Sequence, residues 1–125
     1  MIEPNSELII DFELVRKNIQ EIKKRLPKHC NFMGVIKSDA YGHDLKIATN
    51  AIKDVVDGFG AVRLDEALVI RENSSKPILA MQGVYSTDAY NLLKQNDIWS
   101  VIHSTLQFVL SSCSRYISKC FLFLK

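Results

Sequence analysis

Apolar positions along the chain change repeatedly between a helical and a strand-like spacing. The first helical pattern is predicted to begin after Asp11, a good N-cap residue, and to end at Pro27. Its apolar face consists of residues spaced three or four apart, namely Phe12, Val15, Ile19, Ile22 and Leu26.

Strand-length apolar runs then alternate with helical patterns along the rest of the chain. Strands are predicted at 31–36, 58–62, 77–81 and 98–102, and 119–124 is again an apolar stretch of strand length. Helical patterns lie around 47–52 and 67–70, after Ser86, and from Ser104 through Leu110. This alternation predicts βαβ units and an α/β fold with a parallel sheet, whose strands read as nearly continuous apolar runs.

Two architectures fit this order of elements, a doubly wound sheet and part of a (β/α)₈ barrel. The glycine-rich fingerprint of a dinucleotide-binding fold is absent, and GFGAV at 58–62 lies inside a strand. Lys37, Arg63, Gln82 and His103 each follow a predicted strand, and in a barrel these ends converge on the face that carries the chemistry. The pattern therefore predicts the N-terminal part of a TIM-type barrel. The alternative is that each polar residue only marks the end of a strand, in a buried or capping role for Arg63 and His103.

Composition indicates one ordinary globular domain without a nucleic-acid or membrane partner. The 125 residues are 47% hydrophobic and 24% charged, and the net charge of +2 arises from interspersed signs rather than from a basic stripe. The N-terminus lacks a signal-peptide pattern, and the longest apolar run, CFLFL at 120–124, is too short to cross a bilayer. Three widely spaced cysteines favour a reducing cytoplasm over a disulfide framework, and no Cys/His cluster predicts a metal site.

Lys37 is the residue with the clearest chemical potential. It ends an apolar run in the segment VIKSDAYGHD, at 35–44. Partial desolvation at the end of a buried strand favours a neutral, nucleophilic amine, which a Schiff base with a carbonyl substrate or with pyridoxal phosphate requires. The alternative is an ordinary surface lysine that extends its amine into water.

The flanking segments carry a resemblance to a known family. VIKSDAYGHD, followed in order by GFGAVRLDEA, PILAMQGVYS and VIHS, resembles the N-terminal part of alanine racemase over about residues 8–110. The family segment reads like AVVKANAYGHG, so that Ser38, Asp39 and Asp44 depart from its usual Ala, Asn and Gly. The resemblance implies that Lys37 binds pyridoxal 5'-phosphate covalently and acts as one of two catalytic bases.

The resemblance also implies roles for the residues after Lys37. Tyr41 matches the tyrosine that hydrogen-bonds the cofactor phosphate; the alternative is a ring packed under the small, polar loop that the sequence predicts after Lys37. Gly42 is expected to permit a tight turn beside it. His43 is expected to support the loop or to start the next helix, without a catalytic role.

The whole family architecture is an eight-stranded barrel followed by a β domain, working as a homodimer that interconverts L- and D-alanine for peptidoglycan synthesis. A barrel alone needs about 250 residues. Residues 1–125 are therefore expected to be a partial N-terminal barrel domain without the C-terminal β domain, and to be inactive alone. FLFLK resembles the fifth barrel strand, which would make Lys125 the lysine that is carbamylated in many members; the alternative is unrelated sequence after a frameshift.

Two further functions stay open on the sequence. One is an inactive remnant or interaction fragment. The other is a related barrel enzyme that uses the same cofactor, such as a broad-specificity amino-acid racemase or a decarboxylase.

Overall fold

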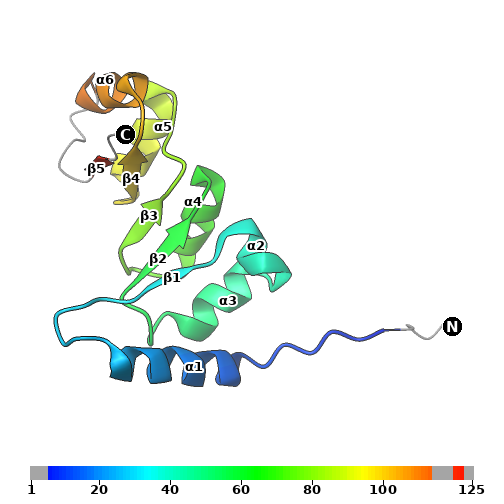
Figure 1. Cartoon of the computed structure of the whole chain (residues 1–125). Coiled ribbons are helices and arrows are strands. Elements are labelled where there is room, and N and C mark those ends of the chain that lie inside the picture. The colour runs from blue at the N-terminus through cyan, green and yellow to red at the C-terminus, as the bar shows by residue number, and fades with distance from the viewer. Residues whose placement is uncertain (1–5, 114–119, 123–125) are drawn as a thin grey trace, which may run out of the picture.

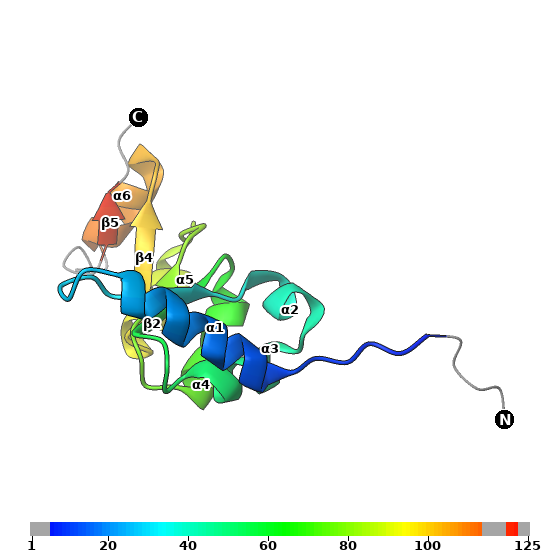
Figure 2. The ribbon, with the colours of Figure 1, turned by 60° about the horizontal axis from the view of Figure 1, so that its bottom comes forward.

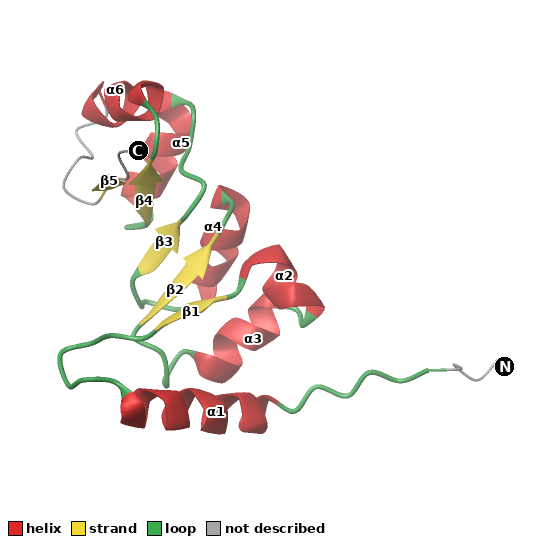
Figure 3. Cartoon of the chain, in the orientation of Figure 1, coloured by secondary structure: helices red, strands yellow, loops and turns green. Residues whose placement is uncertain are grey.

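A computed structural model describes residues 6–113 and 120–122 of the 125-residue chain. Helices and strands alternate along it (Figures 1 and 3). The strands are β1 (Met33–Val35), β2 (Gly58–Ala61), β3 (Ile78–Ala80), β4 (Trp99–Ile102) and β5 (Cys120–Leu122). The helices are α1 (Phe12–Arg25), α2 (Lys37–Gly42), α3 (Leu45–Ile52), α4 (Leu64–Asn73), α5 (Thr87–Gln95) and α6 (Thr105–Cys113).

The five strands form one parallel sheet in the order β1-β2-β3-β4-β5. Met33 pairs with Gly58, Phe59 with Ile78, and the remaining neighbours continue the same parallel register. A doubly wound sheet reverses its strand order at a switch point, whereas here each strand lies beside its successor in the chain. The sheet thus winds in one direction, as in a (β/α)₈ barrel.

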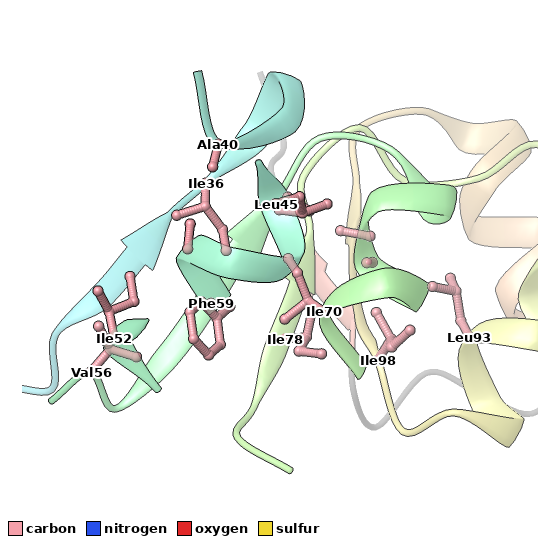
Figure 4. Packing of buried hydrophobic residues seen from close by; sticks show 14 of the residues in the cluster. Ile36, Ala40, Leu45, Ile52, Val56, Phe59, Ile70, Ile78, Leu93 and Ile98 are labelled. Atoms are coloured by element: carbon pink, nitrogen blue, oxygen red, sulfur yellow. The ribbon is translucent and has the colours of Figure 1, made fainter. Parts of the chain in front are cut away.

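The helices that connect the strands pack on one face of the sheet (Figure 1). Phe59 and Ile78 point from the strands into this layer and are fully buried, as is Ile70 of α4, which lies next to Ile78 in the view of Figure 4. Burying a side chain of this size stabilises the fold by about 1.5–3 kcal/mol. This shared core accounts for the apolar residues on the helix-facing side of the strands, such as Phe59 and Ile78.

On the opposite face of the sheet, side chains of β1 lie close to the backbone of β2. A Cβ atom on Gly60 would lie 3.1 Å from Cγ2 of Val35 and 3.6 Å from the sulfur of Met33, and one on Gly58 would lie 3.7 Å from Cε of Met33. The two glycines of β2 therefore leave room for the side chains of β1 to lie across it.

Helix α1 packs beside α3, as both Figure 1 and Figure 2 show. The predicted cap is confirmed, because Oδ1 of Asp11 accepts hydrogen bonds from the backbone N–H groups of Glu13 and Leu14 at 2.9 and 3.2 Å. The predicted apolar face is only partly buried: Ile19 is in the core, whereas Ile22 is 47% exposed because no described element covers it. Extended residues 6–11 run away from the body in both views.

Ion pairs join α1 to the end of α3 and to the turn before β2. Arg16 forms two hydrogen bonds with the Asp54 carboxylate and donates to the carbonyl oxygen of Ala51 at 2.6 Å. Lys23 donates to Oδ1 of Asp57 at 2.8 Å. These contacts fix α1 at the edge where the strands begin, away from the ends that carry the predicted site.

The final predicted strand, at 119–124, is present as β5. Lys125 lies outside the described residues, so its proposed modification stays a prediction. Within 6–113 and 120–122, none of the helices combines the length and apolar character that crossing a bilayer would need.

Candidate active site

Lys37 lies at the carboxyl edge of the sheet, the edge at which all five strands end. The strand contact continues past β1 to the preceding residue, because the N–H of Ile36 donates to the carbonyl oxygen of Gly60 at 2.9 Å. Lys37 is half-buried. Among the residues that the structure describes, no carboxylate forms an ion pair with its amine. As far as the described residues go, the amine of Lys37 is therefore not held by an ion pair.

The segment after Lys37 was predicted to be a loop, and the structure corrects this to a helical turn of left-handed sense. Residues 38–41 have φ between 53° and 57° and ψ between 34° and 53°. The N–H of Ala40 donates to the carbonyl oxygen of Ile36 at 3.1 Å, and that of His43 to Asp39 at 3.1 Å. A left-handed conformation costs an L-residue about 1–2 kcal/mol. Four successive non-glycine residues in it must therefore be fixed by their surroundings.

Glu66, from the first turn of α4, is one residue that fixes this turn. Its Oε1 accepts a hydrogen bond from the N–H of Ser38 at 2.7 Å, and its Oε2 accepts from the N–H groups of Val62 and Arg63, both at 3.2 Å. Sequence reasoning missed Glu66. Its position three residues after Arg63, the N-cap residue of α4, is the capping-box spacing, and this was the available signal.

The aspartates that depart from the family pattern stabilise the start of α3. Oδ1 of Asp39 accepts from the N–H of Leu45 at 2.8 Å, and Oδ1 of Asp44 accepts from that of Ile47 at 2.9 Å. Asp44 has a φ of 66°, in the range that favours glycine. The departures are thus compatible with the fold, because both carboxylates satisfy N–H groups that would otherwise lack partners.

Tyr41 and His43 have different positions around the turn. Tyr41 is 59% exposed, so the alternative of a ring packed under the loop is wrong, and its phenol is available to a ligand. His43 lies within hydrogen-bond distance of the turn, with Nδ1 2.7 Å from the carbonyl oxygen of Ala40. His43 therefore supports the turn, and α3 begins after it, at Leu45.

The other polar residues at strand ends differ in their surroundings: Arg63 is exposed, whereas Gln82 and His103 belong to one hydrogen-bonded group. Arg63 is exposed and forms two hydrogen bonds with Asp65, at 3.0 and 2.7 Å, so a buried role for its side chain is excluded. The ring of His103 donates through Nε2 to the carbonyl oxygen of Gln82 at 2.7 Å. Fully buried Gln107 joins the same group, accepting from the N–H of His103 at 3.0 Å and donating to Gln82 at 3.2 Å.

The structure thus brings Gln82 and His103 together. Within residues 6–113 and 120–122, no hydrogen bond connects them to Lys37.

The shifted pKa values lie at the opposite edge of the sheet. The guanidinium of Arg16 lowers the pKa of Asp54 to about 2, and hydrogen bonds from Lys23 and from the backbone of Phe32 lower the pKa of Asp57. These carboxylates hold α1 in place, and their position excludes them from the candidate site.

A parallel sheet wound in chain order, with a lysine and an exposed tyrosine at its carboxyl edge, defines the N-terminal part of a (β/α)₈ barrel. Solved structures agree with this class. The alanine racemase of Acinetobacter baumannii matches with a TM-score of 0.77 and 28% identity, over 88% of this chain and 33% of that one. An alanine racemase of Clostridium difficile in complex with cycloserine matches with a TM-score of 0.68 and 26% identity, over 81% of this chain and 29% of that one.

Sequence comparison identifies the family. The model for the alanine racemase N-terminal domain matches residues 10–113, and the chain belongs to this family. It is 40% identical to the alanine racemase of Mannheimia succiniciproducens over 91 residues, which are 72% of this chain and 25% of that enzyme. It is 37% identical to that of Hamiltonella defensa over 102 residues, 81% of this chain and 28% of that enzyme. The chain spans about a quarter of the length of the curated relatives that it matches.

Proposed function

We propose that this chain is the lysine-bearing N-terminal part of a pyridoxal-phosphate-dependent alanine racemase, an isomerase that interconverts L- and D-alanine for peptidoglycan synthesis. The observation that supports this most directly is the position of Lys37. It stands at the carboxyl end of the first barrel strand, half-buried and without an ion pair in the described part of the chain, in a segment that matches the family. Family membership supports a racemase; the cofactor and the substrate are our proposal.

The residues present fit pyridoxal phosphate in their chemistry. Lys37 offers a primary amine that can form a Schiff base with an aldehyde, and Tyr41 offers an exposed phenol that can donate to a phosphate oxygen. When bound, the cofactor supplies an electron sink that delocalises the negative charge left after the α-proton of an amino acid is removed.

The proposed role of Lys37 in the reaction is proton transfer on one side of the α-carbon. Its Nζ takes the α-proton from one alanine enantiomer and returns a proton on the same side when the reaction runs in reverse. The left-handed turn carries Lys37 and Tyr41 on one short segment, so that its backbone sets the directions in which both side chains leave the chain. Racemisation also needs an acid–base group on the other side of the α-carbon.

Covalent trapping tests the cofactor assignment. The purified chain is incubated with pyridoxal phosphate and reduced with borohydride, and the modified peptide is identified by mass spectrometry. We expect the adduct at Lys37 and its loss in Lys37→Ala, whereas Lys46→Ala, which removes an exposed lysine from α3, leaves the yield unchanged. An unmodified Lys37, or an adduct that persists in Lys37→Ala, contradicts the assignment.

We also propose that the 125-residue chain does not racemise alanine by itself. The family places the second base in its β domain, across the dimer interface, and this chain spans about a quarter of its relatives. The test is incubation with L-alanine and pyridoxal phosphate, followed by chiral chromatography. Formation of D-alanine above the rate of Lys37→Ala would overturn the proposal.

Two alternatives have distinct outcomes in the same assays. An inactive remnant or interaction fragment gives no adduct at Lys37. A related barrel enzyme, such as a broad-specificity racemase or a decarboxylase, also gives the adduct. It is distinguished from alanine racemase by the products that the natural protein forms from other amino acids. The proposed location is the cytoplasm, where the three widely spaced cysteines stay reduced.

A further inference from the structure

The carboxylate of Glu66 accepts three backbone hydrogen bonds from two successive βα junctions. The N–H of Ser38 follows β1, and the N–H groups of Val62 and Arg63 follow β2. We propose that Glu66 is a positioning residue, which sets the direction of the Lys37 side chain by fixing the peptide on its carboxyl side. This inference rests on the function proposed for Lys37.

The backbone of Lys37 is fixed from both sides. On the amino side, Ile36 donates to Gly60 at 2.9 Å and accepts from Ala40 at 3.1 Å. On the carboxyl side, the N–H of Ser38 belongs to the peptide that joins Lys37 to Ser38, and it is 2.7 Å from Oε1 of Glu66. Because these two peptides determine φ and ψ of Lys37, they also determine where its Cβ points.

Glu66 is itself held by a rigid element. It lies half-buried in the first turn of α4, directly before Ala67, which is fully buried and donates to the carbonyl oxygen of Arg63 at 3.1 Å. In the described part of the chain Glu66 forms no ion pair, so its carboxylate oxygens serve the backbone N–H groups. A charged acceptor makes shorter and stronger hydrogen bonds to N–H groups than a neutral one.

Glu66 therefore couples two neighbouring units at the edge that carries the site. Ser38 is the first residue in the left-handed conformation, and Glu66 contacts it from outside the turn. Without this carboxylate, nothing in α4 holds the Lys37–Ser38 peptide in its present plane, and the amine samples directions that do not favour attack on an aldehyde. A misplacement of about 1 Å can reduce a rate by about a hundredfold.

The test compares Glu66→Ala and Glu66→Gln with a matched control, Glu72→Ala, which removes the same charge from an exposed position on the same helix. Two quantities are measured on folded protein: hydrogen exchange of the Ser38 amide by NMR, and the rate at which borohydride traps pyridoxal phosphate on Lys37. In Glu66→Ala we expect faster exchange at Ser38 and trapping slower by about ten- to hundredfold. Glu72→Ala leaves both unchanged.

Two further variants separate positioning from general stability. Glutamine has one acceptor oxygen and no charge, so Glu66→Gln is expected to fall between Glu66→Ala and the unchanged chain in both measurements. Ile70→Val weakens the core beneath the same helix and is expected to leave the trapping rate per folded molecule unchanged. Equal loss in Ile70→Val would show a merely structural effect and overturn the inference.

The outcomes also separate this inference from the function it rests on. If the unchanged chain gives no adduct, the cofactor assignment fails, and the Ser38 amide still decides whether Glu66 fixes the peptide. If folded Glu66→Ala is trapped as fast as the unchanged chain, or exchanges Ser38 at the same rate, the positioning role is wrong. If Glu66→Ala does not fold, Glu66→Gln replaces it in the test. A Glu66→Gln chain that is trapped as fast as the unchanged chain, or exchanges Ser38 at the same rate, overturns the positioning role.

Discussion

A Cβ atom at Gly83 would lie 2.6 Å from Nε2 of Gln107, a side chain with no exposed surface. It would also lie 2.5 Å from the carbonyl oxygen of Val101, and Gly83 has a φ of 71°. Glycine is thus required twice, once by conformation and once by space. Because Gly83 has no side chain, the segment between β3 and α5 can pass close to the buried amide of Gln107, which hydrogen-bonds to both His103 and Gln82.

Gly83→Ala is therefore expected to lower the free energy of unfolding by about 2 kcal/mol or more, from left-handed strain and from the clashes with Gln107 and with the backbone of Val101. Gly42→Ala is the matched control, because Gly42 has a φ of 84° and a Cβ there meets nothing within 4 Å. It is expected to cost about 1 kcal/mol. Urea unfolding followed by circular dichroism measures both, and equal losses would contradict the clash.

Substitutions at Asp44 separate its capping role from its strained backbone. Asp44→Ala removes the hydrogen bond to the N–H of Ile47 and keeps the positive φ, so it is expected to lower stability by about 1–2 kcal/mol. Asp44→Gly restores the residue of the family pattern. It loses the cap but relaxes the backbone, and its unfolding free energy is expected to match or exceed that of the unchanged chain. Thermal unfolding of the three proteins checks this order.

Acid is expected to weaken the attachment of α1. The pKa values of Asp54 and Asp57 are lower in the folded chain than the ordinary value of 3.8, and that of Asp54 is about 2. As the pH falls, these carboxylates are therefore protonated in the unfolded chain at a higher pH than in the folded chain. The stability that they supply above pH 3.8 is lost as the pH falls from 3.8 toward 2.

Urea unfolding at a series of pH values across this window measures the loss, which should be smaller in Asp57→Asn. Asp88→Asn, which changes an aspartate at the start of α5, serves as the control and should keep the full dependence. A stability that does not change across the window contradicts the role of the ion pairs.

Lys37 and Tyr41 are expected to contribute little to folding. The amine of Lys37 forms no ion pair with a described residue, and the ring of Tyr41 is 59% exposed. Lys37→Ala and Tyr41→Phe should each change the free energy of unfolding by less than about 0.5 kcal/mol, as surface substitutions usually do. Denaturant titration provides the measurement. A larger loss would mean that these residues serve structure rather than a ligand.

The sheet was predictable because its signal is repeated, whereas the geometry around Lys37 depends on contacts between distant residues. Apolar runs placed the strands within a few residues of their observed bounds, and Asp11 and Ser86 gave correct helix starts. The left-handed turn was missed because the propensities of Ser38, Ala40 and Tyr41 oppose it. Ile22 was placed in the core because periodicity shows which side of a helix is apolar, but not how much of that side a neighbour covers.

The hydrogen bond between Glu66 and Ser38 joins residues that lie 28 positions apart in the chain. Ser38 precedes Glu66 in the chain, so the peptide after Lys37 has no carboxylate to meet until α4 has begun to form. The peptide after Lys37 therefore gains this contact only once the second βα unit has begun to form. A nascent chain that emerges N-terminus first therefore exposes Lys37 before it exposes the carboxylate that contacts the following peptide.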